Sequence, residues 1–284
     1  KKDLIAVSFN LTDFSILNNY GVDKLYNISD NKLKVFEVNA YSNNLSNLFN
    51  ELKSEIVVVT SSANSRYLGP ILASKLDAAY MSNVVSIPAS YSPISVKRSC
   101  FTNKAFNETS TKKSAVVLSL SSNSYGLHEN KSNLVFEEIN GIDSNSSLKV
   151  DSLEKLSNKV TIADADIVVS GGRGLKGPEN WHLIEDLAKV LGAATACSKP
   201  VSDMGWRPHS EHVGQTGKPV ASNLYIAIGI SGAIQHLAGI NSSKVKVVIN
   251  NDPEAPFFRS ADYGIVGDAF EVLPKLIEGL KAIK

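Results

Sequence analysis

Short runs of consecutive apolar residues alternate along the chain with stretches in which apolar residues recur every three or four positions. Residues 55–60 and 114–120 are clear apolar runs, and between them residues 65–76 place Leu68 and Leu72 at helical spacing. Continuous apolar runs of this length are typical of parallel strands that are covered on both faces. The pattern therefore predicts an α/β fold in which strands and helices alternate.

The same alternation is sharper from residue 162 onward. Each predicted strand there ends in a glycine-rich or polar turn that leads into a helical stretch, which predicts a parallel sheet with its ligand site at the carboxyl edge. The predicted strands are 165–170, 223–230, 245–249 and 264–266. The predicted helices are 178–191, 233–237 and 269–283.

A length of 284 residues exceeds the usual size of one hydrophobic core and suits two domains. Segments rich in Asn and Ser, at 121–132 and 140–147, are typical of loops and a linker. We therefore predict two doubly wound parallel-sheet domains, residues 1–158 and 159–284.

The composition excludes several classes of protein. A net charge of +1 provides no overall field that would attract nucleic acid or an anionic membrane. No apolar run approaches the roughly 20 residues that span a bilayer, and residues 1–8 do not form a secretory signal. With only Cys100 and Cys197, neither a disulfide framework nor a structural zinc site is indicated. We expect a soluble protein of the bacterial cytoplasm.

Two glycine-rich turns follow predicted strands, at 170–174 and 229–233. Glycines at such places let the backbone approach a phosphate closely, and the free N–H groups of a following helix favour an anion. Neither turn matches the GxGxxG dinucleotide motif, and one such turn is as often purely structural. Two turns in one sheet favour a dinucleotide ligand.

Between these turns lies the loop 213–218, Val-Gly-Gln-Thr-Gly-Lys. Its Gln and Thr side chains supply both hydrogen-bond donors and acceptors, which suit the edge of a flavin ring. A hairpin loop with solvated side chains is the better explanation of the loop when it is considered alone.

Taken together, these stretches and those around them resemble the electron-transfer flavoprotein alpha family. The motifs follow in the family's order and nearly fill residues 165–284. The residues that carry the resemblance are Ser170–Lys176, Val213–Lys218, Leu224–Gly239, Ile249–Pro256 and Ala261–Asp268.

The resemblance implies a C-terminal FAD-binding dinucleotide fold and a set of cofactor contacts. The implied contacts are Arg173, Ser198, Val213, Gly214, Gln215, Thr216, Ser231, Gly232, Ala233, Ile234, Gln235, His236, Asn250, Asp268 and Ala269.

The resemblance also implies how the contacts divide along FAD. Val213 to Thr216 would line the flavin ring, with Thr216 at its reactive N5 atom, while Asn250 and Asp268 with Ala269 would hold the adenosine end. His236 would lie at the pyrimidine side, where a one-electron-reduced ring accumulates negative charge. A donor or partial positive charge there stabilises that charge in a water-poor site.

Without the surrounding motif, His236 is better explained as a core histidine. His128, His182, His209 and His212 are expected at the surface or in loops. No spacing of the HExxH type occurs, so we predict no metal site.

The chain departs from the family pattern at two places. Lys199 follows Ser198 where an Arg is usual, which keeps the charge but loses the planar guanidinium. Family members also carry a longer strand-helix unit before residues 21–24, so the first strand and helix are expected to be shortened or missing. Cys197 beside this site is expected to be an inert packing thiol.

The implied function is that of an electron carrier, not an enzyme, and we assign no catalytic residues. The chain would pair with a beta subunit and bind one FAD per heterodimer, mainly within itself. Electrons would pass from flavin dehydrogenases such as the acyl-CoA dehydrogenases of fatty acid beta-oxidation to a membrane quinone oxidoreductase. Two alternatives stay open: the alpha component of an NAD-linked bifurcating flavoprotein complex, and a non-redox adenine-nucleotide-binding module.

Overall fold

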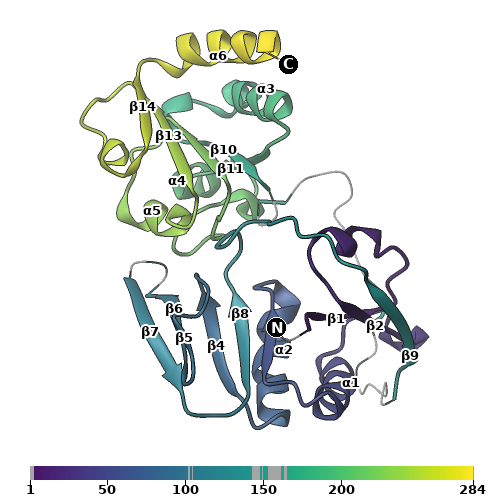
Figure 1. Ribbon diagram of the computed structural model, residues 1–284. Coiled ribbons are helices and arrows are strands. Elements are labelled where there is room, and N and C mark those ends of the chain that lie inside the picture. The colour runs from purple at the N-terminus through teal and green to yellow at the C-terminus, as the bar shows by residue number, and fades with distance from the viewer. Residues whose placement is uncertain are drawn as a thin grey trace. The chain divides into compact units, whose positions relative to one another are not determined.

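In a computed structural model the chain divides into two compact units (Figure 1). The N-terminal unit comprises Lys1–Arg98 and Asn107–Glu154, and the C-terminal unit comprises Ser99–Phe106 and Lys155–Lys284. The structure describes residues 3–101, 103, 105–142, 148, 150–152, 161–162 and 165–283. The predicted boundary between residues 158 and 159 lies outside the described residues.

The N-terminal unit contains two sheets. The first has three parallel strands in the order β1-β2-β9. They are β1 (Ile5–Phe9), β2 (Lys24–Ser29) and β9 (Val135–Asn140). The second sheet has six strands, with β3, β8 and β4 parallel to one another and β6 antiparallel to β4 and β5. They are β3 (Ile56–Val59), β8 (Val116–Leu120), β4 (Ala79–Val84), β6 (Ile94–Cys100), β5 (Ser90–Tyr91) and β7 (Ala105–Thr111).

Helices α1 (Val38–Glu51) and α2 (Ala63–Lys75) pack their apolar sides into one core with strands of both sheets. Leu45 of α1 and Leu72 of α2 meet Val57 of β3 in this core. The carboxylate of Glu37 accepts hydrogen bonds from two backbone N–H groups in the first turn of α1, and Ser62 accepts one in α2. Side-chain caps of this kind define where a helix begins.

The C-terminal unit is built on five parallel strands in the order β11-β10-β12-β13-β14. They are β10 (Ile167–Gly171), β11 (Ala194–Cys197), β12 (Leu224–Ile228), β13 (Val245–Asn250) and β14 (Tyr263–Val266). The chain runs outward from β10 to β11 and then returns to the other side of β10 to form β12. This reversal is the topological switch point of the sheet, where open α/β folds bind their ligands.

Helices cover both faces of this sheet. One face packs on α3 and α6, and the other on α5 and the segment around Phe257. The helices are α3 (His182–Leu191), α4 (Lys199–Asp203), α5 (Ile234–Ile240) and α6 (Ala269–Ile283). Short 3₁₀ turns add η3 (Arg173–Leu175), η4 (Pro178–Trp181), η5 (His209–Glu211) and η6 (Pro256–Ser260).

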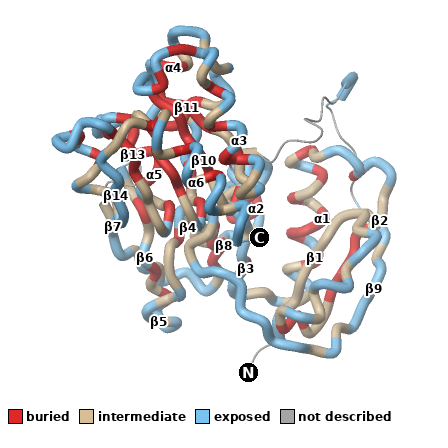
Figure 2. The backbone as a smooth tube through the Cα atoms, turned by 90° about the horizontal axis from the view of Figure 1, so that it is seen from above, coloured by how far each residue is buried: buried red, intermediate tan, exposed pale blue. Residues whose placement is uncertain are grey.

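Successive side chains along the central strands point to opposite faces, as strand geometry requires. Ile226 and Ile228 of β12 join the core with α3 and α6, whereas Tyr225 and Ala227 join the core with α5. Because both faces are covered, β10 and β12 are buried along nearly their whole length, while β14 is an exposed edge strand (Figure 2).

The predicted α/β class with two domains is confirmed. The predicted strands in the C-terminal half correspond to β10, β12, β13 and β14, and the predicted terminal helix corresponds to α6. The structure adds β11, whose four residues Ala-Thr-Ala-Cys lack the bulky apolar run that identifies a strand in a sequence. It also adds antiparallel strands in the N-terminal unit, which the prediction of a purely parallel sheet did not include. No helix among the described residues is long and apolar enough to cross a membrane.

Replacing Leu72 by Ala tests the N-terminal core, because Leu72 is fully buried in α2. We expect the free energy of unfolding of this unit to fall by about 2–5 kcal/mol, as for other buried leucines. Denaturant titration followed by circular dichroism measures the change. Leu127→Ala is the matched control, since Leu127 is 83% exposed in the same unit, and its effect should stay within about 0.5 kcal/mol. Equal losses for both variants would contradict the assigned core.

Candidate functional site

Two glycine-rich turns pack against each other at the switch point between β10 and β12. Gly172 N donates to Ile228 O at 2.8 Å, and Gly174 N donates to Gly229 O at 3.1 Å. A Cβ atom on Gly172 would lie 2.2 Å from the Gly229 oxygen, and one on Gly174 would lie 2.6 Å from the Gly229 Cα. Gly229 itself has a φ of +60°, which favours glycine. The two backbones can approach this closely only because neither carries a side chain.

The loop 213–217 lies beside the end of β11, which is an edge strand of the sheet. Val213 N donates to Cys197 O at 3.0 Å, and Ser198 N donates to Gly171 O at 3.1 Å. On its other side the loop meets α5, where Gln215 N donates to Gln235 O at 2.7 Å. Backbone hydrogen bonds at both ends therefore fix the loop, while the side chains of Gln215 and Thr216 remain exposed.

The turn after β12 carries the segment Ser231–His236 into α5. Gly232 has a φ of +87°, and a Cβ atom there would lie 2.5 Å from the Phe257 nitrogen. Phe257 N in turn donates to Ser231 O at 3.0 Å. The turn is therefore held tightly against η6, which leaves Ser231 exposed and buries His236.

The ends of β13 and β14 complete the edge of the sheet. Asn250 is buried, and its Nδ2 donates to Ile230 O at 3.0 Å while its Oδ1 accepts from Asp252 N at 3.1 Å. Asp268 precedes α6, its Oδ1 accepts from Phe270 N at 3.0 Å, and its Oδ2 lies 3.7 Å from Lys176 Nζ. That ion pair links the turn after β10 to the start of α6.

All the predicted cofactor contacts thus lie at or beside the carboxyl edge of one five-stranded sheet. Across the strands the order is Ser198 with the loop 213–216, then Arg173, then 231–236, then Asn250, then Asp268 with Ala269. The buried members are Ser198, Val213, Gly214, Gly232, His236, Asn250 and Ala269. The exposed members are Arg173, Gln215, Thr216, Ser231, Ala233, Ile234 and Gln235. The edge therefore combines a rigid buried base with exposed groups that can contact a ligand.

His236 is neutral at physiological pH. It is 6% exposed, and burial lowers the pKa of its imidazole to about 4; the nearby His212 lowers the pKa further, and the Val213 backbone opposes the shift. Its Nε2 lies 3.0 Å from the hydroxyl of Tyr225. Its Nδ1 is buried, and the ring interacts with the backbone of Val213 as well as with Tyr225.

His212 corrects one sequence prediction. It was expected at the surface or in a loop, yet it is 1% exposed and its Nδ1 also lacks a hydrogen-bond partner among the described residues. The reason is the bridge that its segment forms with Cys197, which draws the residue before Val213 into the edge of the sheet. Burial lowers the pKa of His212 first, and His209 and Lys199 lower it further. No signal in the sequence distinguishes it from an exposed loop histidine.

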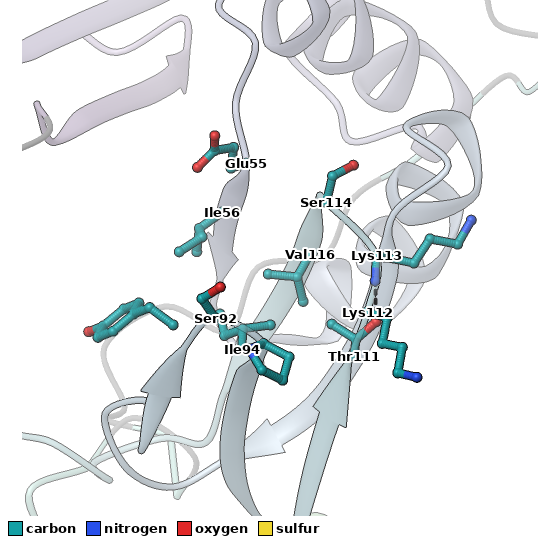
Figure 3. Close-up of a pocket in the computed structure, with 11 residues that line it drawn as sticks. Glu55, Ile56, Ser92, Ile94, Thr111, Lys112, Lys113, Ser114 and Val116 are labelled. Carbon is teal, nitrogen blue, oxygen red and sulfur yellow. Dashed lines mark hydrogen bonds between the residues drawn. The ribbon is translucent and has the colours of Figure 1, made fainter.

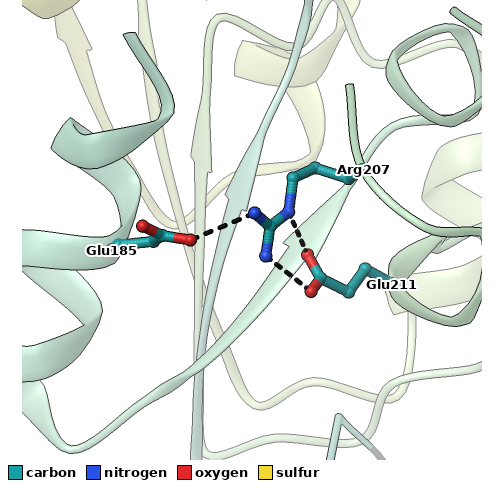
Figure 4. A network of polar contacts seen from close by, with 3 residues as sticks. All are labelled: Glu185, Arg207 and Glu211. Atoms are coloured by element: carbon teal, nitrogen blue, oxygen red, sulfur yellow. Dashed lines mark hydrogen bonds and ion pairs between the residues drawn. The ribbon is translucent and has the colours of Figure 1, made fainter. Parts of the chain in front are cut away.

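Arg207 anchors the segment that leads into the loop. It forms a bidentate pair with Glu211, at 2.8 and 2.7 Å, and a third contact with Glu185 of α3 at 3.1 Å (Figure 4). Its guanidinium also lies 5.4 Å from the centre of the Trp181 ring. Such planar, bidentate pairing fixes geometry better than a lysine could. Sequence reasoning missed this network because Arg207 and Glu185 are distant in the chain.

Lys199 is exposed to solvent, whereas Cys197, two residues earlier, is buried. Lys199 Nζ lies 2.8 Å from Asp203 Oδ2 within α4, and both side chains are largely exposed. Cys197 is fully buried at the end of β11, and burial raises the pKa of its thiol to about 12, with Glu211 adding to the shift and Arg207 opposing it. A protonated, buried thiol agrees with an inert packing role.

A pocket of about 480 Å³ lies in the N-terminal unit and includes none of the predicted contacts (Figure 3). It opens beside Glu55 and Ser114, which precede β3 and β8 and therefore mark the amino edge of that sheet. Ligands of open α/β sheets bind at the opposite, carboxyl edge.

Comparison with known proteins decides the family. Residues 161–241 match the electron transfer flavoprotein FAD-binding domain, and residues 15–152 match the electron transfer flavoprotein domain. The chain is 36% identical to the electron transfer flavoprotein subunit alpha of Bacillus subtilis over 271 residues, which cover 94% of this chain and 83% of the relative. The chain belongs to the electron transfer flavoprotein alpha family. The predicted resemblance is confirmed.

Two further relatives extend the match over the whole chain. The electron transfer flavoprotein subunit alpha of Thermoanaerobacterium thermosaccharolyticum is 35% identical over 292 residues, covering 99% of this chain and 87% of the relative. Protein FixB of Clostridium saccharobutylicum is 33% identical over 300 residues, covering 100% of this chain and 87% of the relative. Both units therefore belong to the region that the family shares.

The geometry of the edge fits the flavin cofactor that the FAD-binding match supports. Glycines at 172, 174 and 229 keep the switch point free of side chains, so a diphosphate could approach the backbone closely there. Beside the loop 213–217, the Nδ1 atom of His212 is buried and lacks a partner among the described residues. A buried polar atom of this kind is unfavourable until a ligand or water satisfies it.

Gly172→Ala tests the packing at the switch point. The added Cβ would lie 2.2 Å from the Gly229 oxygen, so we expect unfolding free energy to fall by about 1–3 kcal/mol and FAD affinity to fall with it. Thermal unfolding and flavin titration measure the two effects. Gly279→Ala in α6 is the matched control, because nothing lies within 4 Å of its added Cβ. It should be neutral or stabilising by up to about 1 kcal/mol.

Acid should destabilise the C-terminal unit through His236. Its pKa is depressed from 6.5 to about 4, so the folded state resists protonation. The stability that neutral His236 provides is present above pH 6.5 and is lost as the pH falls toward 4. Linkage gives a loss of about 3 kcal/mol over this range. Denaturant unfolding at pH 7 and pH 4.5 measures it, and His236→Gln should remove most of this pH dependence.

Proposed function

We propose that this chain is the FAD-holding subunit of an electron carrier. It would bind one FAD, mainly at the carboxyl edge of the C-terminal sheet, and assemble with a beta subunit of the electron transfer flavoprotein. The observation that carries this proposal is the order of the predicted contacts along that edge. Contacts expected at the flavin ring lie on the β11 side, and contacts expected at the adenosine end lie at β13 and β14.

The loop 213–216 and His236 would hold the ring. Gln215 and Thr216 extend from a loop whose backbone is fixed at both ends, so their side chains are positioned before a ligand arrives. His236 would act as a neutral hydrogen-bond donor, because burial keeps its imidazole uncharged. FAD, when bound, supplies the exchange of single electrons; the side chains provide position and electrostatics.

The middle and far parts of the edge would hold the rest of the cofactor. The backbone around Gly172 and Gly229 supports a diphosphate at the switch point. Exposed Ser231 offers a hydroxyl at this turn, and exposed Arg173 offers a positive charge that the resemblance assigns to the region of the flavin ring. Asn250 and Asp268 already form hydrogen bonds that fix their side chains for the adenosine end.

Donors and acceptors are proposed by analogy with the family. Electrons would come from flavin dehydrogenases such as acyl-CoA dehydrogenases and leave to a membrane quinone oxidoreductase, each through a transient complex. Small, transient interfaces do not require a large net charge, which agrees with the value of +1. The proposal assigns no general acid, base or nucleophile to the chain, and it locates the carrier in the bacterial cytoplasm.

Stepwise reduction tests this function. The chain purified with its beta partner should show flavin absorbance with one FAD per heterodimer, and dithionite titration should trap part of the flavin at the one-electron level. In His236→Ala we expect the equilibrium constant that favours this level to fall about tenfold, the size of one buried hydrogen bond. Absorbance spectra recorded through the titration measure the fraction.

His128→Ala is the control, because His128 is exposed and belongs to the N-terminal unit. It should leave both the flavin content and the trapped fraction unchanged. A heterodimer that stays colourless and cannot be reconstituted with FAD would contradict the proposed function.

A further inference from the structure

A short segment leads from α4 into the loop 213–217, the proposed ring loop, and most of it forms neither helix nor strand. Residues 204–212 contain only the 3₁₀ turn η5. From Arg207 to Glu211 the backbone hydrogen bonds stay within the segment. The position of this segment against the sheet therefore depends on its side chains.

Arg207 connects this segment to the rest of the C-terminal unit. Its Nε and Nη2 donate to the two carboxylate oxygens of Glu211 at 2.8 and 2.7 Å, and its Nη1 donates to Glu185 of α3 at 3.1 Å (Figure 4). Glu211 directly precedes His212, which bridges to Cys197 at the end of β11. One guanidinium thus joins α3 to the point where the segment enters the loop.

The centre of this network is shielded from water. The side chains of Arg207 and Glu211 are 18% and 14% exposed, whereas that of Glu185 is 52% exposed. The guanidinium lies 5.4 Å from the centre of the buried Trp181 ring. A Cβ atom on Gly171 would lie 2.6 Å from Trp181 Cη2, so this ring packs on the end of β10. Arg207 therefore holds the loop entrance near the end of a central strand.

The chemistry of the pair requires an arginine at this position. The hydrogen bond with Glu211 raises the pKa of Arg207, so its guanidinium stays charged. Without it, Glu211 would keep a negative charge in a largely desolvated place, and Glu185 would add a second one. Removing one partner of such a pair costs more than the intact pair contributes. A lysine would supply the charge, but its point-like ammonium lacks the planar fork that pairs with Glu211 through two N–H groups.

We propose that Arg207 is a positioning residue for the flavin-ring end of the site, because its pairing with Glu211 holds the proposed ring loop in place. The identity of the ligand rests on the proposed function, but the fixing of the loop does not. Arg207 is not among the predicted cofactor contacts and acts on the ligand through the loop backbone. The predicted adenosine contacts Asn250 and Asp268 lie at β13 and β14, on the other side of the sheet from β11. The effect of Arg207 is therefore confined to the ring end.

Hydrogen exchange of the full chain with its beta subunit tests the loop directly, with and without FAD. In Arg207→Gln we expect the loop amides to exchange about tenfold faster, as for the loss of one charge-assisted pair, while the amides of β13 keep their rate. The amides to follow are those that donate to backbone oxygens, at Val213, Gln215, Gly217 and Lys218. Unchanged exchange at these amides would overturn the inference.

Ile277→Val is the matched control for a general loss of stability. Ile277 is 9% exposed in α6 and belongs to the same core as Trp181. Its shortening should cost about 0.5–1.5 kcal/mol. We expect the loop amides to keep their wild-type exchange rate in this variant. Equal acceleration in both variants would show that Arg207 only stabilises the unit, and would overturn the positioning role.

FAD and ADP distinguish the two ends of the site, because ADP carries the adenosine and the diphosphate without the flavin ring. We expect Arg207→Gln to weaken FAD binding about tenfold and to leave ADP binding unchanged. Glu211→Gln should cause the same selective loss, and the double variant should lose no more than Arg207→Gln alone, since both changes remove one interaction. Calorimetric titration of the heterodimer measures both affinities. Equal losses for FAD and ADP would overturn the inference.

The outcomes separate this inference from the proposed function. A wild-type heterodimer that binds no FAD would contradict the proposed function, whereas faster loop exchange in Arg207→Gln would still support the positioning role. If Arg207→Gln does not fold, Glu211→Gln gives the same comparison, because it leaves Arg207 charged and paired with Glu185. Wild-type loop exchange and FAD affinity in Glu211→Gln would then overturn the inference.

Discussion

The site depends on the contact between two glycine turns at the point where the C-terminal sheet reverses direction. Gly172 and Gly229 touch backbone to backbone, and any side chain at Gly172 would overlap the carbonyl of Gly229. This contact brings the ends of β10 and β12 together, and the ends of β11 and β13 follow from their pairing with these strands. The loop 213–217, α5 and the Asn250 turn are then attached to a rigid edge. A cofactor that spans the whole edge requires all of these elements in one register.

Local pattern was sufficient to predict the central strands and the terminal helix of the C-terminal unit, because long apolar runs and amphipathic periodicity are strong signals. It did not identify β11, since Ala-Thr-Ala-Cys has little bulk, nor most of the N-terminal strands, whose apolar residues are interspersed with polar ones. The strand β11 becomes stable through its neighbours on the sheet and not through its own composition. Tertiary context of that kind cannot be deduced from a short sequence window.

The motifs predict a candidate site whose residues lie together at the carboxyl edge of the C-terminal sheet, but they did not show how its side chains are supported. Arg207 reaches Glu185 across 22 positions, and Tyr225 reaches His236 across 11. The two residues of each pair lie on different elements of the fold, so neither contact leaves a periodic signal in the sequence. The burial of His212 arose in the same way, from a bridge to Cys197. These supporting contacts depend on the fold, and only the structure reveals them.

The burial of Cys197 determines which redox reactions its thiol can undergo. Thiol chemistry proceeds through the thiolate, and a thiol with a pKa near 12 is almost entirely protonated in the cell. Cys197 lies beside the start of the proposed ring loop, yet burial and protonation withhold it from disulfide exchange and peroxide. Two-electron sulfur chemistry of Cys197 is thereby excluded beside the proposed ring loop. Oxidants would reach the partly exposed Cys100 before the buried Cys197.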